Sequence, residues 1–251
     1  MIKLKIFFIV LVSISPSIIS QNLINCERSC PGSQLTPTPH PFGFSSSCQI
    51  QLNCTSNGTV LIGEFPVQQI NADDLLVGLP TKCGRPVEAL SLLYGEHYAP
   101  LSTNAVLLEM CIEPKHNCII PETTLETNFE NMINCSSGQD GYGNVSCYSG
   151  DISSNFLEYE NITRMGCRCL FSGITSDISG DSGTVSLEVQ MIKLGWWLKG
   201  SCDCSGDADC MKVVSPVDGS EGYRCNCKSG LDGDGYTTGS RCGEGKGMPT
   251  F

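Results

Sequence analysis

Six cysteines close to the C-terminal end show the most regular spacing of any reactive side chains in this sequence. They follow the pattern Cys202-x-Cys204-x5-Cys210-x14-Cys225-x-Cys227-x14-Cys242. Thiols in such a pattern can form disulfides or bind zinc, but zinc ligands usually occur as Cys-x2–4-Cys pairs. Six cysteines allow fifteen disulfide pairings, and the spacing alone does not choose among them. We expect a disulfide-linked module and no metal site, because about 40 residues bury too little surface to fold without cross-links.

A second pattern with catalytic potential is Gly-Asp-Ser-Gly at 180–183, the nucleophile motif of chymotrypsin-like serine proteases. A serine nucleophile also needs a histidine base and an orienting acid. The three histidines, His40, His97 and His116, lie in sequence contexts unlike those of a protease, and Thr184 follows where that family has another glycine. No two carboxylates have a spacing that singles out a glycosidase pair. We therefore expect a hairpin turn at 180–183 and no enzymatic activity.

The first twenty residues have the order of a secretory signal peptide. Lys3 and Lys5 precede the apolar run Ile6 to Val12, and small polar residues follow up to Ser20. A membrane span needs roughly 20 apolar residues, and this run is shorter. We interpret residues 1–20 as a cleaved signal and expect a secreted, extracellular chain that starts near Gln21.

The composition agrees with export. The chain has 251 residues, 17 cysteines, and 15 Lys+Arg against 26 Asp+Glu, a formal net charge of −11. So many thiols indicate an oxidising compartment, where most of them form disulfides. The acidic balance argues against a nucleic-acid partner, because neutralising phosphates needs a surplus of Lys and Arg. Because the number of cysteines is odd, one of them has no partner for an intramolecular disulfide. We expect this cysteine among the seven between Cys26 and Cys118.

Five Asn-x-Ser/Thr sequons also fit a secreted chain, since glycosylated asparagines lie on exposed turns. They are Asn53, Asn57, Asn134, Asn144 and Asn161. In the sequons of Asn53 and Asn134 the middle residue is a cysteine that we expect to form a disulfide, so we rank these two lower.

Short apolar runs separated by turn residues predict strands. The runs are Val60 to Ile62, Phe65 to Ile70, Leu90 to Tyr94 and Ala105 to Met110, and Thr184 to Met191 alternates apolar and polar residues with a period of two. After Lys193 the apolar phase shifts, which predicts a β-bulge. Residues 71–76 are instead expected to form a single helical turn.

The cysteine pattern at 202–242 resembles an EGF-like domain, since a Cys-x-Cys pair is followed by a glycine and aromatic turn at 233–236. The resemblance implies the pairs Cys202–Cys210, Cys204–Cys225 and Cys227–Cys242. Calcium is not expected in this module. The segment 198–201 before it has no carboxylate, although Asp218 and Tyr223 match part of the calcium-binding pattern, and 232–235 lacks the later Glu of an EF-hand loop.

Four phrases in the rest of the chain resemble the extracellular part of plant wall-associated receptor kinase-like proteins. They are CPGSQLTPTPHPFGFSSSCQIQLNC, YGNVSCYSG, FLEYENITRMGCRCLFSGI and LGWWLKGSC. The predicted fold is mainly β and disulfide-rich, with small β-domains followed by a C-terminal EGF-like module. The predicted divisions are a signal peptide at 1–20, a galacturonan-binding-like domain at 21–120, a second cysteine-rich β domain at 121–200, the EGF-like module at 201–242 and a tail at 243–251.

The kinase part of that family has no counterpart in this sequence, which contains no Gly-rich phosphate loop, catalytic Asp motif or DFG. The chain is therefore expected to be either a fragment of a longer, membrane-anchored receptor or a secreted protein that resembles the ectodomain. The phenylalanines Phe42 and Phe44 are expected in the core. Trp196 and Trp197 are also expected there, and at least one of them should pack against the EGF-like module as a rigid joint.

The resemblance implies binding of cell-wall pectin or oligogalacturonides. The best local cluster of cations and aromatic rings is Lys82, Arg85, Tyr94, His97 and Tyr98. The alternative is that both tyrosines are half-buried sheet residues and the cations are solvated. No resident cofactor is expected, although calcium could bridge the acidic chain to pectin.

Acids outnumber bases between Gln21 and Ile120, so this region does not attract a polyanion at long range. This mismatch motivates an alternative function without polysaccharide binding. In that alternative the chain is an ectodomain that recognises a protein or peptide, such as a co-receptor or a decoy.

Overall fold

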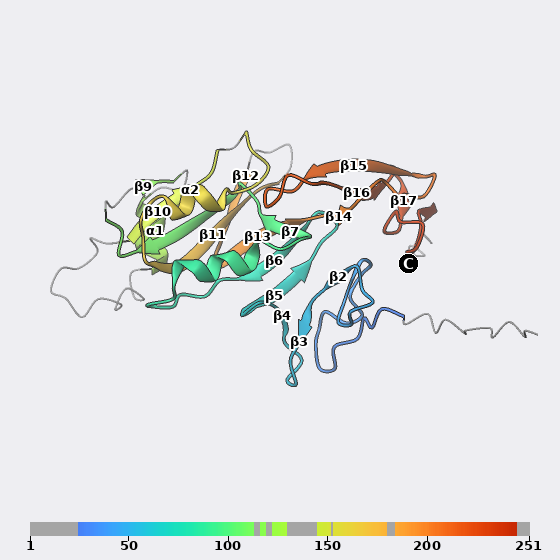
Figure 1. Cartoon of the computed structure of the whole chain (residues 1–251), viewed down its shortest axis with the longest axis horizontal. Helices are drawn as coiled ribbons and strands as arrows, with labels where there is room; N and C mark the ends of the chain where they lie inside the picture. The colour runs from blue at the N-terminus through green and yellow to red at the C-terminus, as the bar shows by residue number, and fades with distance from the viewer. Residues whose placement is uncertain are drawn as a thin grey trace, which may run out of the picture.

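A computed structural model describes residues 25–112, 116–118, 122–129, 145–151, 153–179 and 184–244 of the chain. The described part is mainly β, as the sequence predicts, and two sheets form its body (Figure 1). The N-terminal loop (residues 25–52) and the C-terminal module (residues 198–244) lie at the same end of this body. The helices α1 (Glu122–Phe129) and α2 (Tyr159–Thr163) lie at the other end (Figure 1).

The first sheet has six strands in the order β3-β4-β5-β6-β13-β7. Their bounds are Asn53–Cys54 for β3, Val60–Ile62 for β4, Phe65–Ile70 for β5, Asp74–Gly78 for β6, Met191–Trp196 for β13 and Tyr98–Pro100 for β7. The predicted strands β4 and β5 are confirmed. The helical turn predicted at 71–76 is wrong, because Leu75 and Val77 are fully buried where β6 pairs with both β5 and β13.

The second sheet has five strands in the order β12-β11-β8-β10-β9. Their bounds are Thr184–Val189 for β12, Cys169–Ser179 for β11, Asn104–Glu109 for β8, Val145–Ser149 for β10 and His116–Asn117 for β9. Strand β8 is central, and all six of its residues are buried, which explains its continuous apolar run. The strand predicted at Ala105 to Met110 is confirmed, and the strand predicted at Thr184 to Met191 is confirmed as far as Val189.

The chain passes from one sheet to the other at Gln190, which has a φ of 62°. Strand β12 before it pairs with β11, and β13 after it pairs with β6 and β7. The bulge predicted after Lys193 is wrong, since Lys193 lies in regular pairing with Leu76. The shift of apolar phase in the sequence marks this change of sheet instead.

Both sheets contain strands from each side of residue 120. Strand β13 completes the sheet formed by the earlier strands β4 to β7, and β8 lies between β10 and β11. The main hydrophobic core accordingly runs from Cys30 to Tyr236. The domain boundary expected near residue 120 therefore does not coincide with a break between sheets.

Within the described residues, three short helices complete the body: the 3₁₀ helix η1 at Val87–Leu93, α1 at Glu122–Phe129 and α2 at Tyr159–Thr163. The strand predicted at Leu90 to Tyr94 is wrong. Val87, Leu90 and Leu93 are buried at a spacing of three, the period of a 3₁₀ helix, and Pro86 precedes the first turn. A short apolar run does not by itself distinguish the two structures.

Disulfides fix the loop-rich segments of the body. The pairs are Cys26–Cys48, Cys30–Cys54, Cys111–Cys167 and Cys118–Cys147, and Cys83 is also disulfide-bonded. Among the described residues the free cysteine is Cys169, at the buried start of β11. The expectation that the odd cysteine lies between Cys26 and Cys118 is therefore wrong. In the Cys-x-Cys pair at 167 and 169, Cys167 forms a disulfide and Cys169 is a free thiol.

The C-terminal module contains the sheet β14-β16-β15 and the hairpin β17-β18. Bounds are Leu198–Lys199 for β14, Ala208–Val214 for β15, Glu221–Cys227 for β16, Leu231–Asp232 for β17 and Gly243–Glu244 for β18. Its disulfides are Cys202–Cys210, Cys204–Cys225 and Cys227–Cys242, the same pairs that the resemblance to an EGF-like domain implies.

Both tryptophans lie at the joint of this module with the body, and both are buried. Trp197 packs with Val213 of β15 and lies against Gly222 of β16, while the Trp196 ring lies 6.5 Å from that of Tyr236. The predicted packing of a tryptophan against the C-terminal module is confirmed, and the rigidity of this joint stays a prediction. Phe42 is buried as expected, and Phe44 is partly buried against the same core.

Several sequence predictions fall outside the described residues: the signal peptide, the sequons of Asn134 and Asn144, the turn at 180–183 and most of the tail. Of the other sequons, Asn53 and Asn57 are exposed, while the Asn161 side chain donates a hydrogen bond to Glu158 Oε2 at 2.6 Å. Among the helices of the described residues, none has the length and apolar character needed to cross a membrane.

Candidate functional site

Lys82 and Arg85 of the binding cluster predicted from the sequence lie just before the first residue of η1. Arg85 is only 3% exposed; its Nε lies 3.2 Å from Glu64 Oε1, and its Nη2 donates to Pro80 O at 2.9 Å. The guanidinium also lies 5.4 Å from the centre of the Phe65 ring. Burial lowers the pKa of Arg85, and Glu64 opposes that shift. Arg85 thus serves internal contacts, whereas Lys82 is exposed.

The other three members of that cluster lie beyond the far end of η1. The Tyr94 hydroxyl donates to Leu157 O at 2.8 Å, and burial raises the pKa of Tyr94. His97 Nδ1 lies 3.1 Å from Trp197 O, and Tyr98 packs so closely over Gly95 that a Cβ there would lie 2.6 Å from its ring. These contacts agree with the alternative in that both tyrosines are partly buried. That alternative is wrong on two points, since Tyr94 follows η1 instead of lying in a sheet and the Arg85 cation is buried instead of solvated. A ligand-binding role for the cluster stays a prediction.

A different site is hollowed between the N-terminal loop and the EGF-like module. The cleft has a volume of about 720 Å³. Its lining residues come from four segments far apart in the sequence, namely Arg28, Pro37, Thr38, Pro39, His40 and Phe42, then Ile70, Asn71 and Ala72, then Trp196, and finally Cys225, Asn226, Cys227, Gly233, Asp234, Tyr236 and Ser240. None of the five residues of the sequence-predicted cluster lines it.

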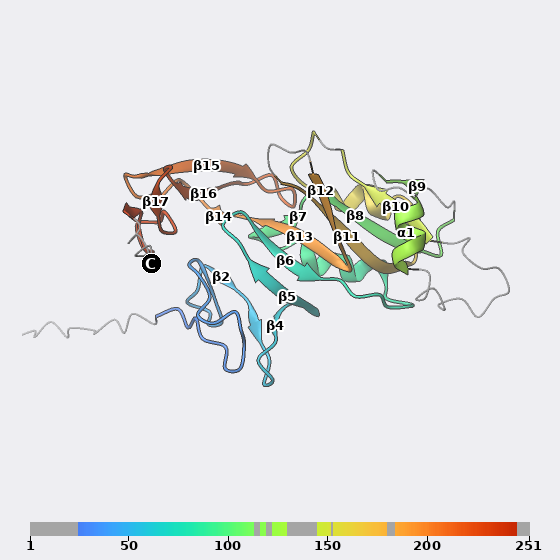
Figure 2. The same ribbon diagram turned by 180° about the vertical axis from the view of Figure 1, so that it is seen from behind.

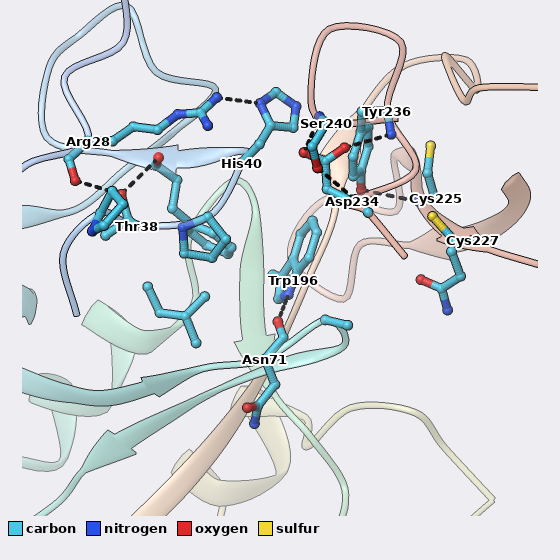
Figure 3. A pocket seen from close by; sticks show the side chains of 17 residues that line it. Arg28, Thr38, His40, Asn71, Trp196, Cys225, Cys227, Asp234, Tyr236 and Ser240 are labelled. Atoms are coloured by element: carbon cyan, nitrogen blue, oxygen red, sulfur yellow. Dashed lines mark hydrogen bonds between the residues drawn. The ribbon is translucent and has the colours of Figure 1, made fainter. Parts of the chain in front are cut away.

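The N-terminal wall is a proline-rich loop fixed by backbone contacts and two disulfides. Cys26–Cys48 and Cys30–Cys54 close the loop, and Thr38 N–H donates to Arg28 O at 3.0 Å. The buried Thr38 hydroxyl also donates to Phe42 O at 3.2 Å. These bonds hold the segment that carries Arg28 beside the segment that carries His40. Figure 3 shows the Arg28 and His40 side chains meeting in the wall of the cleft.

Arg28 and His40 form a hydrogen-bonded pair, with 3.1 Å between Arg28 Nη2 and His40 Nδ1. Since a guanidinium can only donate, Nδ1 accepts, and a neutral His40 carries its proton on Nε2. That Nε2 is buried and has no hydrogen-bond partner among the described residues. Burial lowers the pKa of His40; the Asp234 carboxylate opposes this shift and the Arg28 cation adds to it.

The opposite wall belongs to the EGF-like module. The Tyr236 hydroxyl accepts from Cys225 N–H at 3.2 Å, and burial raises the pKa of Tyr236 to about 12. The Asp234 carboxylate accepts hydrogen bonds from the backbone N–H of Tyr236 at 3.0 Å and from that of Ser240 at 2.8 Å. These two bonds fix the conformation of the turn. The Tyr236 ring lies 5.1 Å from the His40 ring, so the two walls touch (Figure 3).

Apolar rings form the floor. Phe42 and Trp196 meet edge to face at 5.1 Å, and Trp196 Nε1 donates to Asn71 O at 3.3 Å. Rings beside amide groups and a cation can hold a polar, ring-shaped ligand that carries a negative charge. Among the described residues, no three side chains of His, Cys, Asp or Glu are grouped so that they could hold a metal ion.

Sequence reasoning missed the four residues that define this cleft: Arg28, His40, Trp196 and Tyr236. Two local signals existed, since Arg28 is one of the few bases of its region and His40 stands between two prolines. Neither signal shows that the N-terminal loop meets the last turn of the chain. That contact depends on the disulfides and on the joint at Trp196 and Trp197.

The architecture defines a disulfide-rich β-protein whose interleaved body ends in an EGF-like module. The chain is homologous to two wall-associated receptor kinase-like proteins of Arabidopsis thaliana. It is 36% identical to wall-associated receptor kinase-like 14 over 248 residues, covering 94% of this chain and 34% of the relative. It is 33% identical to wall-associated receptor kinase-like 21 over 213 residues, covering 81% of this chain and 32% of the relative.

The chain thus spans about a third of the length of these curated relatives. The homology supports a receptor-kinase-type ectodomain and agrees with the resemblance drawn from the sequence phrases. No protein-family model matches the chain, and no solved structure matches it.

Proposed function

We propose that this chain is a non-catalytic extracellular ectodomain that binds acidic cell-wall polysaccharide of the pectin class, and that the cleft is its binding site. The observation that carries the proposal is that Arg28 lines a large cleft together with the aromatic rings of Phe42 and Trp196. The homology to wall-associated receptor kinase-like proteins supports an extracellular location at the cell wall.

The electrostatics favour one local contact over a basic surface. With a net charge of −11 the chain repels a polyanion at long range, so affinity must come from short-range bonds. A bidentate guanidinium–carboxylate pair supplies such bonds, and the lining of the cleft includes one guanidinium, that of Arg28. Calcium is a second route, because it could bridge pectin to exposed carboxylates of the chain.

Calorimetric titration of the secreted, disulfide-intact chain with oligogalacturonides tests the proposal. The titration is done at two salt concentrations, with calcium or with a chelator. Arg28→Ala should weaken binding about tenfold or more, because a hydrogen bond to a charged group contributes about 1.5–3 kcal/mol. Lys82→Ala is the matched control and should bind like the wild type.

The outcomes separate the two candidate sites. Loss of binding in Lys82→Ala with unchanged binding in Arg28→Ala would move the site to the cluster predicted from the sequence. If the folded wild-type chain shows no binding of oligogalacturonide under any of these conditions, the proposal of polysaccharide binding is overturned.

Recognition of a protein or peptide is the second candidate, and strand β15 is the observation that favours it. This strand is the edge of its sheet and follows the outer side of the molecule (Figure 2). Met211 and Val214 on it are 42% and 62% exposed. Exposed strand edges pair with extended peptides. Cross-linking in wall extracts should then capture a protein partner that is lost in Met211→Lys, and an empty catch would contradict this candidate.

A further inference from the structure

The hydrogen bond between Arg28 and His40 engages both side chains of the cleft that could carry a positive charge. Arg28 Nη2 lies 3.1 Å from His40 Nδ1, so one guanidinium N–H is directed at the imidazole instead of the open cleft. The other imidazole nitrogen is buried and has no hydrogen-bond partner in the part of the chain that the structure describes. A polar atom in that state costs free energy until a ligand or solvent satisfies it.

Adding a proton to His40 reverses this arrangement. A protonated imidazole carries N–H on both nitrogens, so Nδ1 can no longer accept from Arg28. The Arg28 N–H group is then released, and His40 presents a second donor with a full positive charge. Two adjacent cations repel each other, and an anion between them removes that repulsion.

The charged and titratable groups that face His40 from the surrounding elements are Arg28, Asp234 and Tyr236. The Asp234 carboxylate already accepts the backbone N–H groups of its own turn, at 3.0 Å and 2.8 Å. It attracts the protonated imidazole from a distance but is held by that turn. Tyr236 remains neutral at physiological pH, because burial raises its pKa to about 12.

We propose that Arg28 and His40 form a proton-coupled clamp for one carboxylate of an acidic sugar, in which His40 takes up one proton from solvent as the carboxylate enters. The one covalent change is the new Nδ1–H bond of His40, whose proton leaves a solvent or buffer acid. The Arg28–His40 hydrogen bond breaks, and both side chains donate to the carboxylate oxygens. This inference rests on the proposed function and adds a specific regulation to the same site, namely tighter binding at acidic pH.

The sign of the pH dependence follows from linkage. In the free cleft the pKa of His40 lies below its ordinary value of 6.5, mainly because of burial. A bound carboxylate beside the ring raises that pKa, so binding is accompanied by proton uptake. Affinity should rise as pH falls from 7 to 5, by up to about tenfold per pH unit, the limit for one proton.

The experiment measures the clamp in two independent ways on the whole secreted chain. Calorimetry with oligogalacturonide at pH 5, 6 and 7, in buffers of different ionisation enthalpy, gives the affinity and the number of protons taken up. NMR titration of the imidazole signals gives the pKa of His40 with and without ligand. The chain has three histidines, so His97→Gln and His116→Gln assign the signals and serve as controls.

The wild type should take up protons on binding, at most one per ligand, and the His40 pKa should rise on binding. His40→Gln should bind with a nearly pH-independent affinity, whereas His97→Gln keeps the pH dependence. A neutral galactose oligomer should bind weakly at every pH. A sulfated galactose oligomer that binds as well as the galacturonide would reassign the site to anions in general and overturn its assignment to carboxylates.

Unchanged His40 pKa on binding, or equal pH dependence in wild type and His40→Gln, would overturn the clamp. If oligogalacturonide binds while Arg28→Ala and His40→Gln behave like the wild type, the clamp fails and polysaccharide binding stands. If the folded wild-type chain binds nothing at pH 5 or 7, both proposals fail. The NMR titration needs only the wild-type fold and the two assignment variants, so instability of His40→Gln does not remove the test.

Discussion

The ring of His40 in the N-terminal loop lies 5.1 Å from the ring of Tyr236 in the EGF-like module, although the two residues stand near opposite ends of the described chain. Between them Trp196 connects to both walls, through Phe42 at 5.1 Å and Tyr236 at 6.5 Å. Arg224 of the module also forms an ion pair with Asp73 of the body, at 3.5 Å. A ligand in the cleft would therefore contact three parts of the molecule at once.

The joint between body and module depends on the absence of a side chain at Gly222. A Cβ there would lie 2.4 Å from Trp197 Cδ1 and 2.7 Å from Leu198 O. Gly222→Ala should lower the free energy of unfolding by about 1–3 kcal/mol, as overpacking does. Thermal unfolding with intact disulfides measures the loss.

Gly206→Ala in the same module is the matched control. Nothing lies within 4 Å of a Cβ at Gly206, so its effect should stay within about 0.5 kcal/mol. Equal stability of the two variants would show that Trp197 does not pack against Gly222 in solution.

Arg85 should contribute to stability and not to ligand binding. Arg85→Ala removes the contacts to Glu64 and Pro80 and leaves the Phe65 ring without its cation. We expect a loss of about 1–3 kcal/mol, because a hydrogen-bonded charge is removed while Glu64 remains partly solvated. Urea unfolding measures this loss, and calorimetry should give an unchanged affinity for oligogalacturonide. Lys82→Ala, at an exposed cation three residues earlier, should change neither quantity.

Local patterns in the sequence were sufficient for some strands and insufficient for others. Two strands, Val60 to Ile62 and the alternating run from Thr184, could be predicted from the sequence. In each of them the order of the residues indicates which face is turned toward the core. The apolar run from Leu90 does not show the three-residue period of a 3₁₀ helix, because Val87, the first buried residue of that period, lies before the run. Lys193 was misread because a shift of phase looks the same for a bulge and for a change of sheet.

The cleft was beyond sequence reasoning for a different reason. Arg28 and His40 become neighbours only after two disulfides close their loop, and Tyr236 reaches them only through the packing of the module. Connectivity of cysteines cannot be deduced from spacing, and non-local packing leaves no period in the sequence. The cysteine pattern of the EGF-like module was informative because a family resemblance supplied its pairing.

Cys169 should behave as a buried, unreactive thiol. It is 7% exposed, and burial, together with Glu109, raises its pKa, so little thiolate forms at neutral pH. Iodoacetamide should leave Cys169 unmodified in the native chain and alkylate it after unfolding, as peptide mass spectrometry can show. Cys169→Ala should abolish that labelled peptide and leave the disulfides intact. Rapid alkylation of the native chain would contradict burial of this residue.

Acid should destabilise the ligand-free chain through its two partly buried histidines. Burial is the main cause that lowers the pKa of His40 and of His97 below 6.5. A histidine with a lowered pKa in the folded state contributes stability above pH 6.5, and that contribution is lost as pH falls through the lowered pKa, because the unfolded chain binds the proton more readily. Urea unfolding at pH 7.5, 6.5 and 5.5 should therefore give a decreasing free energy of unfolding. The decrease should be smaller in His40→Gln, and saturating oligogalacturonide should reduce it in the wild type, since the bound carboxylate favours protonated His40. A free energy of unfolding that rises between pH 6.5 and 5.5 would show that neither imidazole is held in its neutral form.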